Sequence, residues 1–593
     1  MRQLRFVSLL FFITLSLTTL GGSQTVTLKI IETTDEHGAI FPYDFINDRG
    51  TTGSLAQVQT YVQQERQNPD QQVLLLSGGD ILQGQPAVYY FNFEKTNVPH
   101  LYARVMNYMG YDAGAVGNHD IETGHAVYDK FALQLDLPWL AANAVRTDNG
   151  QPYFPPYTVF ERKGVKIAIL GMITPGIPNW LPPGIWSGMK FDDMIKTARK
   201  WVPLIQEREH PDLLLGLFHS GVDFTYGGQT AETPRNENAA RLVAEQVSGF
   251  DIIFVGHDHH GWNFTTTNPD GDSVSVLGAS IHARDVAAAT VMLTYDPDSG
   301  IWHKQISGEI VDMAKFAPDS TFMATFAPDF EEIKAYVSRP IGRFTKAIST
   351  REAMFGNSAF VDLIHQIQLE LTGAEISVAA PLSFDATIEK GQVFVRDMFN
   401  LYKFENLLYT LELTGQEIKD FLTYSYSGWF DQMQNPEDHL LKFVRDKNGA
   451  IQYSKRTNSP RLHGAYFNFD SMAGIRYTVD VSMPANERIT ISALADGEPF
   501  ELSKKYKVAI NSYRGNGGGG HLTAGAHIPK EELPDRIISS TEKDLRYFMM
   551  KWIEKKKVVT PVAFGNWQVV PGDWWRAAKQ RDYQLLYGSQ RLN

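Results

Sequence analysis

Five short polar segments in the first half of the chain carry side chains that commonly bind divalent metals. They contain Asp35-Glu36-His37, Gly79-Asp80, Gly117-Asn118-His119-Asp120, His219-Ser220-Gly221 and Gly256-His257-Asp258-His259. Carboxylates, neutral imidazoles and one amide carbonyl, without sulfur, suit cations such as Zn, Mn, Mg or Fe. Each segment alone is ordinary turn chemistry, and a lone histidine is more often structural than a ligand. It is the ordered set of five that predicts a metal site.

Each of these segments follows a short aliphatic strand that the sequence predicts. The expected strands cover residues 26–31, 73–76, 113–116, 166–170, 213–218 and 251–255, all rich in β-branched or aliphatic side chains. Up to about residue 307 they alternate with helix-like stretches, which is typical of an α/β fold with a parallel sheet. Carboxyl ends of parallel strands meet at one sheet edge, where ligands bind. We therefore expect the five segments to converge.

Length and composition narrow the class of protein. The 593 residues exceed what one core usually organises, so two large domains are expected. Hydrophobic residues make up 43% and charged residues 21%, which excludes a largely disordered, collagenous or coiled-coil chain. The net charge of -12 and the lack of a long Lys/Arg block oppose binding of nucleic-acid polymers or anionic membranes. The absence of cysteine excludes disulfides, thiolate ligands and cysteine nucleophiles.

The N-terminus has the layout of a signal peptide. Arg2 and Arg5 precede an apolar run over residues 7–20, and small residues follow at 21–23. The run is shorter than the ~18 apolar residues that a membrane span prefers. We expect cleavage near Ser23 and export to the periplasm or the medium. The mature chain is expected to be a monomer without a membrane anchor, and to act on a small molecule.

A second domain of mixed α/β architecture is expected after Pro340. A helix is predicted over residues 328–337, with acidic residues in its first turn and apolar residues at helical spacing. Beyond it, helices are predicted over residues 359–371 and 416–424, and strands over 376–380, 408–413, 475–481 and 506–510. We divide the chain into a signal peptide (1–23), a first domain (24–310), a linker with a helix (311–345), a second domain (346–560) and a C-terminal extension (561–593). Tryptophans in the extension are expected to pack back onto a domain.

The five polar segments resemble those of the calcineurin-like metallophosphoesterases, and the whole mature chain resembles the two-domain 5'-nucleotidase family. The resemblance implies a four-layer α/β/β/α sandwich followed by a mixed α/β substrate domain. It implies two divalent metal ions, one held by Asp35, His37, Asp80 and His259 and the other by Asp80, Asn118, His219 and His257. Two cations about 3.5–4 Å apart polarise a phosphoryl oxygen and activate a water for in-line attack. The bridging ligand must be anionic, as Asp80 is.

His119 follows the ligand position Asn118, and in the family this histidine faces the substrate phosphate. It would stabilise charge in the transition state or protonate the leaving oxygen. Such a histidine needs an orienting acid, which the family often places three residues on, at Glu122. The adjacent Asp120 is the competing candidate, either for that role or for ordering the loop. Three further polar residues are interpreted as loop residues without a catalytic role: Asp258, His260 and His282.

The second half is most similar to the 2',3'-cyclic-nucleotide 2'-phosphodiesterase/3'-nucleotidase branch of the family. The similarity lies in residues 379–381 (AAP), 400–406 (NLYKFEN), 413–415 (LTG), 467–470 (FNFD) and 511–520. In the family a base is held between two aromatic rings, which match Phe404 and Tyr513, and Asn406 adds a polar contact. Core packing is the alternative for each ring. The charged neighbours of Phe404 and the glycine loop after Tyr513 favour the clamp.

The chain departs from true 5'-nucleotidases where they carry a phosphate-binding arginine. Residues 381–385 read PLSFD here, and we interpret Asp385 as a charge that repels a 5'-phosphomonoester. The loop over residues 511–520 also lacks an acid that some relatives place among its glycines. The first departure favours 2',3'-cyclic and 3'-nucleotides as substrates, and the second leaves the mode of sugar recognition open. The alternatives are a 5'-nucleotidase or nucleotide-sugar hydrolase, and a non-catalytic nucleotide-binding protein, which would be free to lose the ligand positions.

Overall fold

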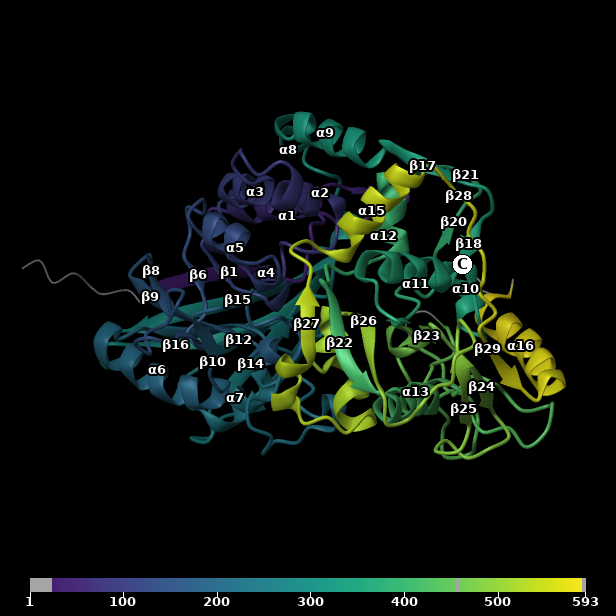
Figure 1. The fold of residues 1–593 in the computed structure, drawn as a ribbon. Coiled ribbons are helices and arrows are strands. Elements are labelled where there is room, and N and C mark those ends of the chain that lie inside the picture. Colours follow the sequence, from purple (N-terminus) through teal and green to yellow (C-terminus); the bar gives the residue numbers. More distant parts are fainter. Residues whose placement is uncertain (1–23, 455–457, 589–593) are drawn as a thin grey trace, which may run out of the picture.

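The computed structural model describes residues 24–454 and 458–588. The predicted signal peptide lies outside these residues, as do the last five of the C-terminal extension. Figure 1 shows the first half of the chain on the left and the second half on the right. Across the described ranges, no helix has the length and apolar character needed to cross a membrane.

The first half contains two six-stranded sheets. One sheet has the order β16-β15-β1-β4-β5-β6 and the other β13-β14-β12-β11-β9-β8. The strands of the first are β1 (Thr25–Thr33), β4 (Gln71–Ser77), β5 (Ala113–Ala115), β6 (Trp139–Leu140), β15 (Asp285–Asp296) and β16 (Ile301–Asp312). Those of the second are β8 (Tyr157–Arg162), β9 (Val165–Ile173), β11 (Leu213–His219), β12 (Ile252–Val255), β13 (Trp262–Thr267) and β14 (Ser273–Gly278). Each sheet combines parallel inner strands with antiparallel strands at its margin.

The two sheets pack face to face, and helices cover their outer faces. Leu28 and Leu74 of the first sheet share a buried cluster with Leu215 and Ile252 of the second. Helices α1 (Leu55–Gln67) and α3 (Leu101–Met109) pack in the cluster on the outer side of the first sheet. Helices α6 (Met194–Glu209) and α7 (Ala240–Gln246) do the same for the second. This arrangement confirms the predicted four-layer α/β/β/α sandwich. Such layers form because the apolar faces of both sheets must be covered on each side.

The segment between the two halves packs against the first domain. Helix α9 spans Ala327–Val337 and agrees with the predicted helix. Its buried Ile333 and Val337 join the cluster on the outer side of the first sheet. Asp329 in its first turn forms an ion pair with Arg104 of α3. The helix is therefore fixed to the first domain on one face, and β17 (Pro340–Phe344) continues into the second half.

The second half is built around a five-stranded mixed sheet with the order β23-β19-β26-β22-β27. Its strands are β19 (Ile376–Ala379), β22 (Leu408–Thr414), β23 (Ser471–Ala473), β26 (Lys505–Asn511) and β27 (Ile537–Ser540). The helices packed around it are α11 (Ala359–Thr372), α12 (Val395–Leu401), α13 (Gly415–Trp429) and α15 (Leu545–Lys556). The Leu-Thr-Gly segment at 413–415 leads from the end of β22 into α13, where Thr414 and Glu417 form a capping box.

The C-terminal extension packs onto the second domain, as its tryptophans predicted. Strand β29 (Trp567–Val570) pairs in parallel with β24 (Ile475–Asp480). The Trp567 ring is buried and stacks on Tyr477, with ring centroids 5.7 Å apart. Helix α16 (Gly572–Tyr587) follows and buries Ala578 and Leu586. The extension therefore completes a core that the rest of the domain leaves open.

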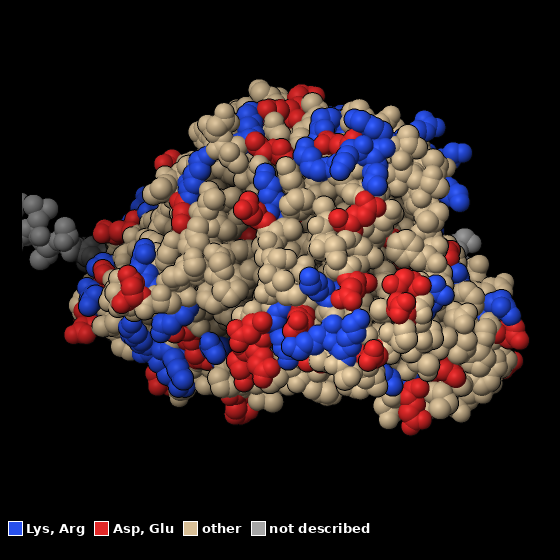
Figure 2. All heavy atoms as spheres, in the orientation of Figure 1, with Lys and Arg blue, Asp and Glu red and all other residues tan. Residues whose placement is uncertain are grey.

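Charged side chains of both signs are spread over the visible surface of the molecule. In Figure 2 lysine and arginine are intermixed with aspartate and glutamate over the visible face, with uncharged areas between them. A protein that tracks a nucleic-acid backbone instead presents a continuous basic stripe. The visible face has no such stripe.

Candidate metal centre

The predicted metal-binding residues lie at carboxyl ends of strands from both sheets. Asp35 and His37 follow β1, Asp80 follows β4, Asn118 begins α4 (Asn118–Glu122) just after β5, His219 ends β11, and His257 and His259 follow β12. The structure brings them into two groups that share Asp80. Within each group the possible ligand atoms lie within 4.8 Å of one another. The groups consist of Asp35, His37, Asp80 and His259, and of Asp80, His219 and His257.

The amide oxygen of Asn118 lies beside the second group. This Oδ1 atom lies 3.1 Å from His219 Nε2 and 2.8 Å from His257 Nδ1. His219 Nε2 also lies 3.1 Å from Asp80 Oδ2. Four donor atoms from four strand ends thus face one another, although Asn118 and His257 are far apart in the chain. The set offers one carboxylate, one amide oxygen and two imidazoles, which suits a divalent cation.

The first group contains two imidazole nitrogens that point at each other. His37 Nε2 lies 3.2 Å from His259 Nε2, and His259 Nε2 lies 3.4 Å from Asp35 Oδ1. The shared residue Asp80 is 1% exposed, and its Oδ2 accepts no hydrogen bond. Buried carboxylate oxygens without a hydrogen bond are rare in folded proteins. The residues therefore fit divalent cations, whose charge would satisfy Asp80 and the imidazole lone pairs together.

Backbone carbonyls set the tautomers of two predicted ligands. The Nδ1 atom of His37 lies 3.1 Å from the Gln83 carbonyl oxygen, and Nδ1 of His219 lies 2.8 Å from that of Gly78. A carbonyl only accepts, so each Nδ1 carries the proton and each Nε2 presents a lone pair to the centre. His257 is turned the other way: its Nε2 lies 3.9 Å from Glu237 Oε1, and its Nδ1 faces the centre.

The loops that carry these residues have unusual backbone conformations. Positive φ values occur at Asp35 (52°), His37 (48°), Asp80 (58°), His257 (78°) and His259 (61°). Non-glycine residues seldom adopt this region, and those that do cluster at functional sites. Position 117 requires glycine for a steric reason, because a Cβ there would lie 2.2 Å from an oxygen of Asp80. The glycine therefore lets the strand end approach the shared carboxylate.

The structure separates the two acids beside His119. Nδ1 of His119 donates to the Glu122 carboxylate, one helical turn on. The Asp120 carboxylate instead accepts backbone N–H bonds of 2.8–3.1 Å from Gly117, Asp80, Ile81 and Leu82. Asp120 thus fixes the loop that carries Asp80. The His119 side chain is 27% exposed and can reach a bound molecule.

Charges in the centre shift several pKa values. Burial alone would lower the pKa of His119, but the Asp80 and Glu122 carboxylates raise it to about 10. For Asp80 burial would raise the pKa, yet His219 and His119 hold it well below its usual range. Burial lowers the pKa of His37 to about 3, so its imidazole is neutral. Ionised carboxylates and a neutral imidazole are the forms that bind metals, and bound cations would oppose the rise at His119.

Other residues contact the centre that the sequence pattern did not assign to it. Glu237 lies beside His257 on a loop without a recognisable motif, and Trp180 packs on the His257 ring with centroids 5.6 Å apart. The His282 ring lies 5.9 Å from that of His37, and its backbone N–H donates to Asp35. By contrast, Asp258 accepts from Val222 and Trp262, and His260 is exposed, in agreement with their interpretation as loop residues.

The proposed base-binding residues lie on the face of the second domain towards this centre. Phe404 and Tyr513 are half-buried, and Phe404 packs edge-to-face on Phe467 at 6.2 Å. Glu405, next to Phe404, is among the charges that raise the pKa of His119. The pKa of Tyr513 is raised by burial and, more weakly, by charges that include Glu237. Both segments therefore lie within electrostatic reach of the metal centre. No stacking between Phe404 and Tyr513 is seen in the described part of the chain.

Asp385 has a partner that the sequence did not reveal. Arg351 Nε lies 2.6 Å from its Oδ1 and Nη2 lies 3.0 Å from Oδ2, a two-point ion pair. The charge of Asp385 is thus compensated, and a compensated carboxylate does not repel a phosphate strongly. The interpretation of Asp385 as a barrier to 5'-phosphates loses its physical basis.

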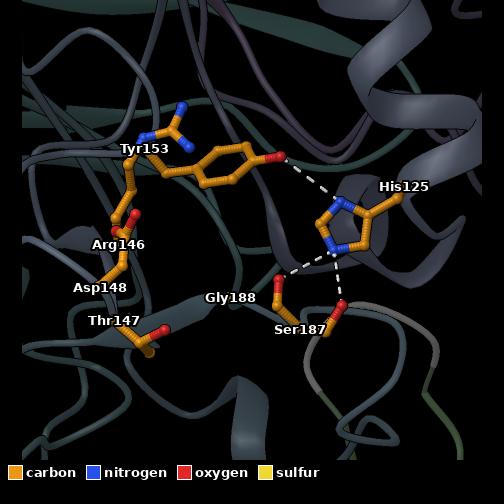
Figure 3. Close-up of a pocket in the computed structure, with 7 residues that line it drawn as sticks. All are labelled: His125, Arg146, Thr147, Asp148, Tyr153, Ser187 and Gly188. Carbon is orange, nitrogen blue, oxygen red and sulfur yellow. Dashed lines mark hydrogen bonds between the residues drawn. The ribbon is translucent and has the colours of Figure 1, made fainter.

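A surface cavity of about 430 Å³ lies in the first domain outside the ligand set (Figure 3). The Nε2 atom of His125 lies 3.0 Å from the Ser187 carbonyl, and the Arg146 guanidinium lies over the Tyr153 ring at 4.4 Å. Its polar side chains are thus engaged with one another, and none of the predicted metal ligands lines it. The lining residues are His125, Arg146, Thr147, Asp148, Tyr153, Ser187 and Gly188.

Two family models match the chain. The calcineurin-like phosphoesterase model matches residues 28–261, and the 5'-nucleotidase C-terminal domain model matches residues 340–526. The chain therefore combines a calcineurin-like phosphoesterase domain with a 5'-nucleotidase C-terminal domain. The first match covers all five metal-binding segments as far as residue 261, and the second covers Phe404, Asn406 and Tyr513. A divalent metal is therefore implied by the fold as well as by the geometry.

Relatives of this two-domain chain match it over nearly its full length. It is 26% identical to the 2',3'-cyclic-nucleotide 2'-phosphodiesterase/3'-nucleotidase of Salmonella typhimurium, over 93% of this chain and 90% of that protein. It is also 26% identical to the trifunctional nucleotide phosphoesterase protein YfkN of Bacillus subtilis, but spans only 39% of its length. A putative 5'-nucleotidase from Staphylococcus aureus shares the fold, with a TM-score of 0.73 and 21% identity over 92% of this chain and 99% of that one.

Proposed function

We propose that this chain is a metal-dependent phosphoric ester hydrolase that acts on 2',3'-cyclic nucleotides and 3'-nucleotides. The observation that carries the proposal is the convergence of seven predicted ligands, from strands of two sheets, around the shared carboxylate of Asp80. The substrate class is supported by the full-length relative from Salmonella typhimurium. A non-catalytic binding protein would not need this complete set.

A 5'-nucleotidase is the second candidate. The chain is 24% identical to a 5'-nucleotidase from Vibrio cholerae over 89% of its length. The ion pair between Arg351 and Asp385 also removes a reason to exclude 5'-phosphates. Both candidates hydrolyse a nucleotide phosphoester with bound metal, so they differ only in which phosphate position of the nucleotide they prefer.

We assign one cation to Asp35, His37, Asp80 and His259, and a second to Asp80, Asn118, His219 and His257. Bound cations of this kind supply Lewis acidity that polarises a phosphoryl oxygen and lowers the pKa of water. The chain contributes the shared anion, Asp80, and the fixed tautomers that point the imidazole lone pairs inward. Zn, Mn, Mg and Fe remain the candidate metals, because the set contains no sulfur.

His119 is the proposed catalytic residue from the chain itself. Glu122 holds the proton on Nδ1, so Nε2 is the nitrogen left to face the phosphate and the leaving oxygen. From there it can stabilise developing negative charge or deliver a proton to the leaving group. Asp120, which we considered for the orienting role, is proposed to order the loop instead. Glu122 then positions the ring.

The second domain is proposed to bind the nucleoside. Phe404 and Tyr513 would stack on the base, and Asn406 would add a polar contact. A nucleotide must then bridge the two domains, with its phosphate at the metals. We also propose that the signal peptide directs export, with cleavage near Ser23, and that the enzyme is a monomer.

The proposed function is tested by phosphate release from 2',3'-cyclic, 3'- and 5'-nucleotides, using apoprotein reloaded with Zn, Mn, Mg or Fe in separate samples. We expect kcat/KM for cyclic and 3'-substrates to exceed that for the matching 5'-nucleotide by at least about tenfold, a difference of ~1.4 kcal/mol in transition-state stabilisation. The reverse order would establish the 5'-nucleotidase instead. Stoichiometric metal without turnover of any nucleotide would show that the chain is a binding protein.

Tyr513→Ala is expected to impair nucleotide hydrolysis selectively. Base–aromatic stacking is worth about 1–3 kcal/mol per base, which corresponds to a roughly five- to 150-fold fall in kcat/KM. Hydrolysis of bis(p-nitrophenyl) phosphate should hardly change, because that substrate has no base to stack. The measurement is steady-state kinetics on a 2',3'-cyclic nucleotide and on the aryl diester with the same enzyme sample.

A matched control for this substitution is Tyr453→Ala, which removes an exposed tyrosine elsewhere in the second domain. It should leave both substrates unaffected. An equal loss on both substrates for Tyr513→Ala would identify the ring as a packing residue. Unchanged kinetics on both would remove Tyr513 from the site.

A further inference from the structure

A buried arginine of the second domain holds the segment that carries Phe404. Arg546 lies in the first turn of α15 and is 2% exposed. Its Nε donates to the carbonyl oxygen of Tyr402 at 2.9 Å, and its Nη2 donates to that of Lys403 at 2.6 Å. These two carbonyls directly precede Phe404. The guanidinium therefore fixes the backbone from which the ring projects.

The same segment has two more contacts with the start of α15. The backbone N–H of Leu545 donates to the Asn406 carbonyl at 2.8 Å. The Glu405 carboxyl lies 3.6 Å from Nη1 of Arg546, and both of its oxygens are buried without a hydrogen bond. Arg546 thus provides the compensating charge for a buried acid as well as two main-chain contacts. Residues 402–406 therefore contact the first turn of α15 at both ends of the segment.

The start of α15 also contacts the first domain. The hydroxyl of Tyr89 donates to Oδ2 of Asp544, the N-cap of α15, at 2.9 Å. The Arg546 guanidinium lies over the Tyr89 ring at 4.8 Å and over the Phe399 ring at 4.2 Å. Tyr89 is 2% exposed. One buried joint therefore connects the first domain, the start of α15 and the segment that carries Phe404.

On the other side of this joint, the chain leads directly to the metal centre. Helix α2 (Pro86–Tyr89) follows the segment that carries Asp80. Between them, Gln83 accepts from Nδ1 of His37 at 3.1 Å, and Gln85 donates its N–H to the His37 carbonyl at 2.9 Å. A continuous series of contacts thus runs from a predicted metal ligand through Tyr89 to the base-binding segment.

We propose that Arg546 is a positioning residue that sets where Phe404 and Asn406 hold the nucleoside relative to the metal centre. This inference rests on the proposed function, because it presupposes a substrate that bridges the domains. Binding energy at a remote base speeds the chemical step only if the base site and the metals keep a fixed spacing. The planar guanidinium suits this task, since it contacts two carbonyls at once while packing between two rings.

Arg546→Lys tests the inference because it keeps the charge but loses the two-point contact. We expect kcat/KM for a 2',3'-cyclic nucleotide to fall about tenfold as one charge-assisted hydrogen bond is lost. The fall should include a lower kcat, because a misplaced base no longer positions the phosphate at the metals. Hydrolysis of bis(p-nitrophenyl) phosphate and the metal content should stay at wild-type values. Tyr89→Phe removes only the hydroxyl at the joint, and it should lower nucleotide kcat/KM in the same selective way, by about threefold.

Arg488→Lys is the matched control. Arg488 is also 2% exposed in the second domain and donates to the main-chain carbonyl of Phe430 at 2.9 Å, but it holds a segment outside the base site. It should lower Tm without changing the ratio of the two activities. If Arg546→Lys fails to fold, Tyr89→Phe decides.

Two outcomes of these experiments are distinguishable. The positioning role alone would be overturned if the wild-type chain turns over nucleotides and the variants at Arg546 and Tyr89 keep its nucleotide kcat/KM. The same holds if these variants lose activity on the nucleotide and on the aryl diester equally. A wild-type chain that hydrolyses only the aryl diester and no nucleotide would overturn the proposed function, and the inference with it.

Discussion

Asp80→Asn is expected to remove both metal binding and turnover. The substitution replaces the shared anionic ligand with a neutral amide, whose single carbonyl oxygen cannot serve two cations. Loss of a residue that merely orients a ligand typically costs 10–100-fold in metal affinity or activity. Loss of a ligand shared by both groups should exceed that, so we expect kcat to fall by more than about a hundredfold. Metal content after dialysis, measured by mass spectrometry, and kcat at saturating metal check the two parts separately.

Asp258→Asn is the control for that result. Asp258 lies between His257 and His259, yet its carboxylate accepts from Val222 and Trp262 instead of facing the centre. The variant should keep its metal and most of its activity. Full metal occupancy and normal turnover in Asp80→Asn would show that the shared-carboxylate assignment is wrong.

His119→Ala is expected to lose activity while keeping the metals. Its ring lies beside the ligand groups, and its Nδ1 is bonded to Glu122, so its removal takes no ligand away. General acid catalysis or stabilisation of developing charge contributes about 10²–10⁴ in rate. We therefore expect kcat to fall by that factor at unchanged metal content. Loss of the metals, with wild-type rates after reconstitution, would contradict this division of roles.

Substitutions of Glu122 and Asp120, the two acids near His119, test whether these residues have separate roles. Glu122→Gln should lower kcat less than His119→Ala does, because the ring remains but its orientation and proton affinity are weakened. Asp120→Asn removes an acceptor from the amides of the loop that carries Asp80, so it should lower Tm. An equal kinetic effect of both substitutions, without a change in Tm, would argue against separate roles.

Much of the fold followed from local patterns in the sequence. The predicted strands over residues 26–31, 213–218 and 251–255 correspond to β1, β11 and β12. The structure extends β1 and β11 slightly, and it begins β12 one residue later than predicted. These strands are buried on both faces and therefore appear as uninterrupted aliphatic runs. The long antiparallel strands β15 and β16 were not predicted. Their place beside β1 is decided by pairing over a long sequence distance.

In the second domain, too, the regular elements were predicted from local patterns, whereas long-range contacts were not. Helix α11 and strands β19, β22, β24 and β26 match their predicted ranges closely, whereas α13 continues to Trp429, beyond the predicted end at residue 424. Phe404 and Tyr513 were predicted from resemblance, and the structure places both near the first domain without a direct contact between the rings. Their role in base binding stays a prediction. The balance of charge around Asp385 could not be predicted, because its partner Arg351 lies on a separate element.

The sequence by itself determined the chemical identity of the candidate site, because each predicted ligand directly follows or ends a strand, and parallel strands bring such positions to one edge. Tertiary structure decided which of these groups act together. It assigned Glu122 to His119, bound Asp120 to backbone amides, turned His37 and His219 to present Nε2, and paired Asp385. It also placed Arg546 between the base-binding segment and Tyr89, which is 457 positions away in the chain by residue number. Hydrogen bonds, ring contacts and ion pairs depend on distances of a few ångströms between residues far apart in sequence, and no local pattern of residue types encodes those distances.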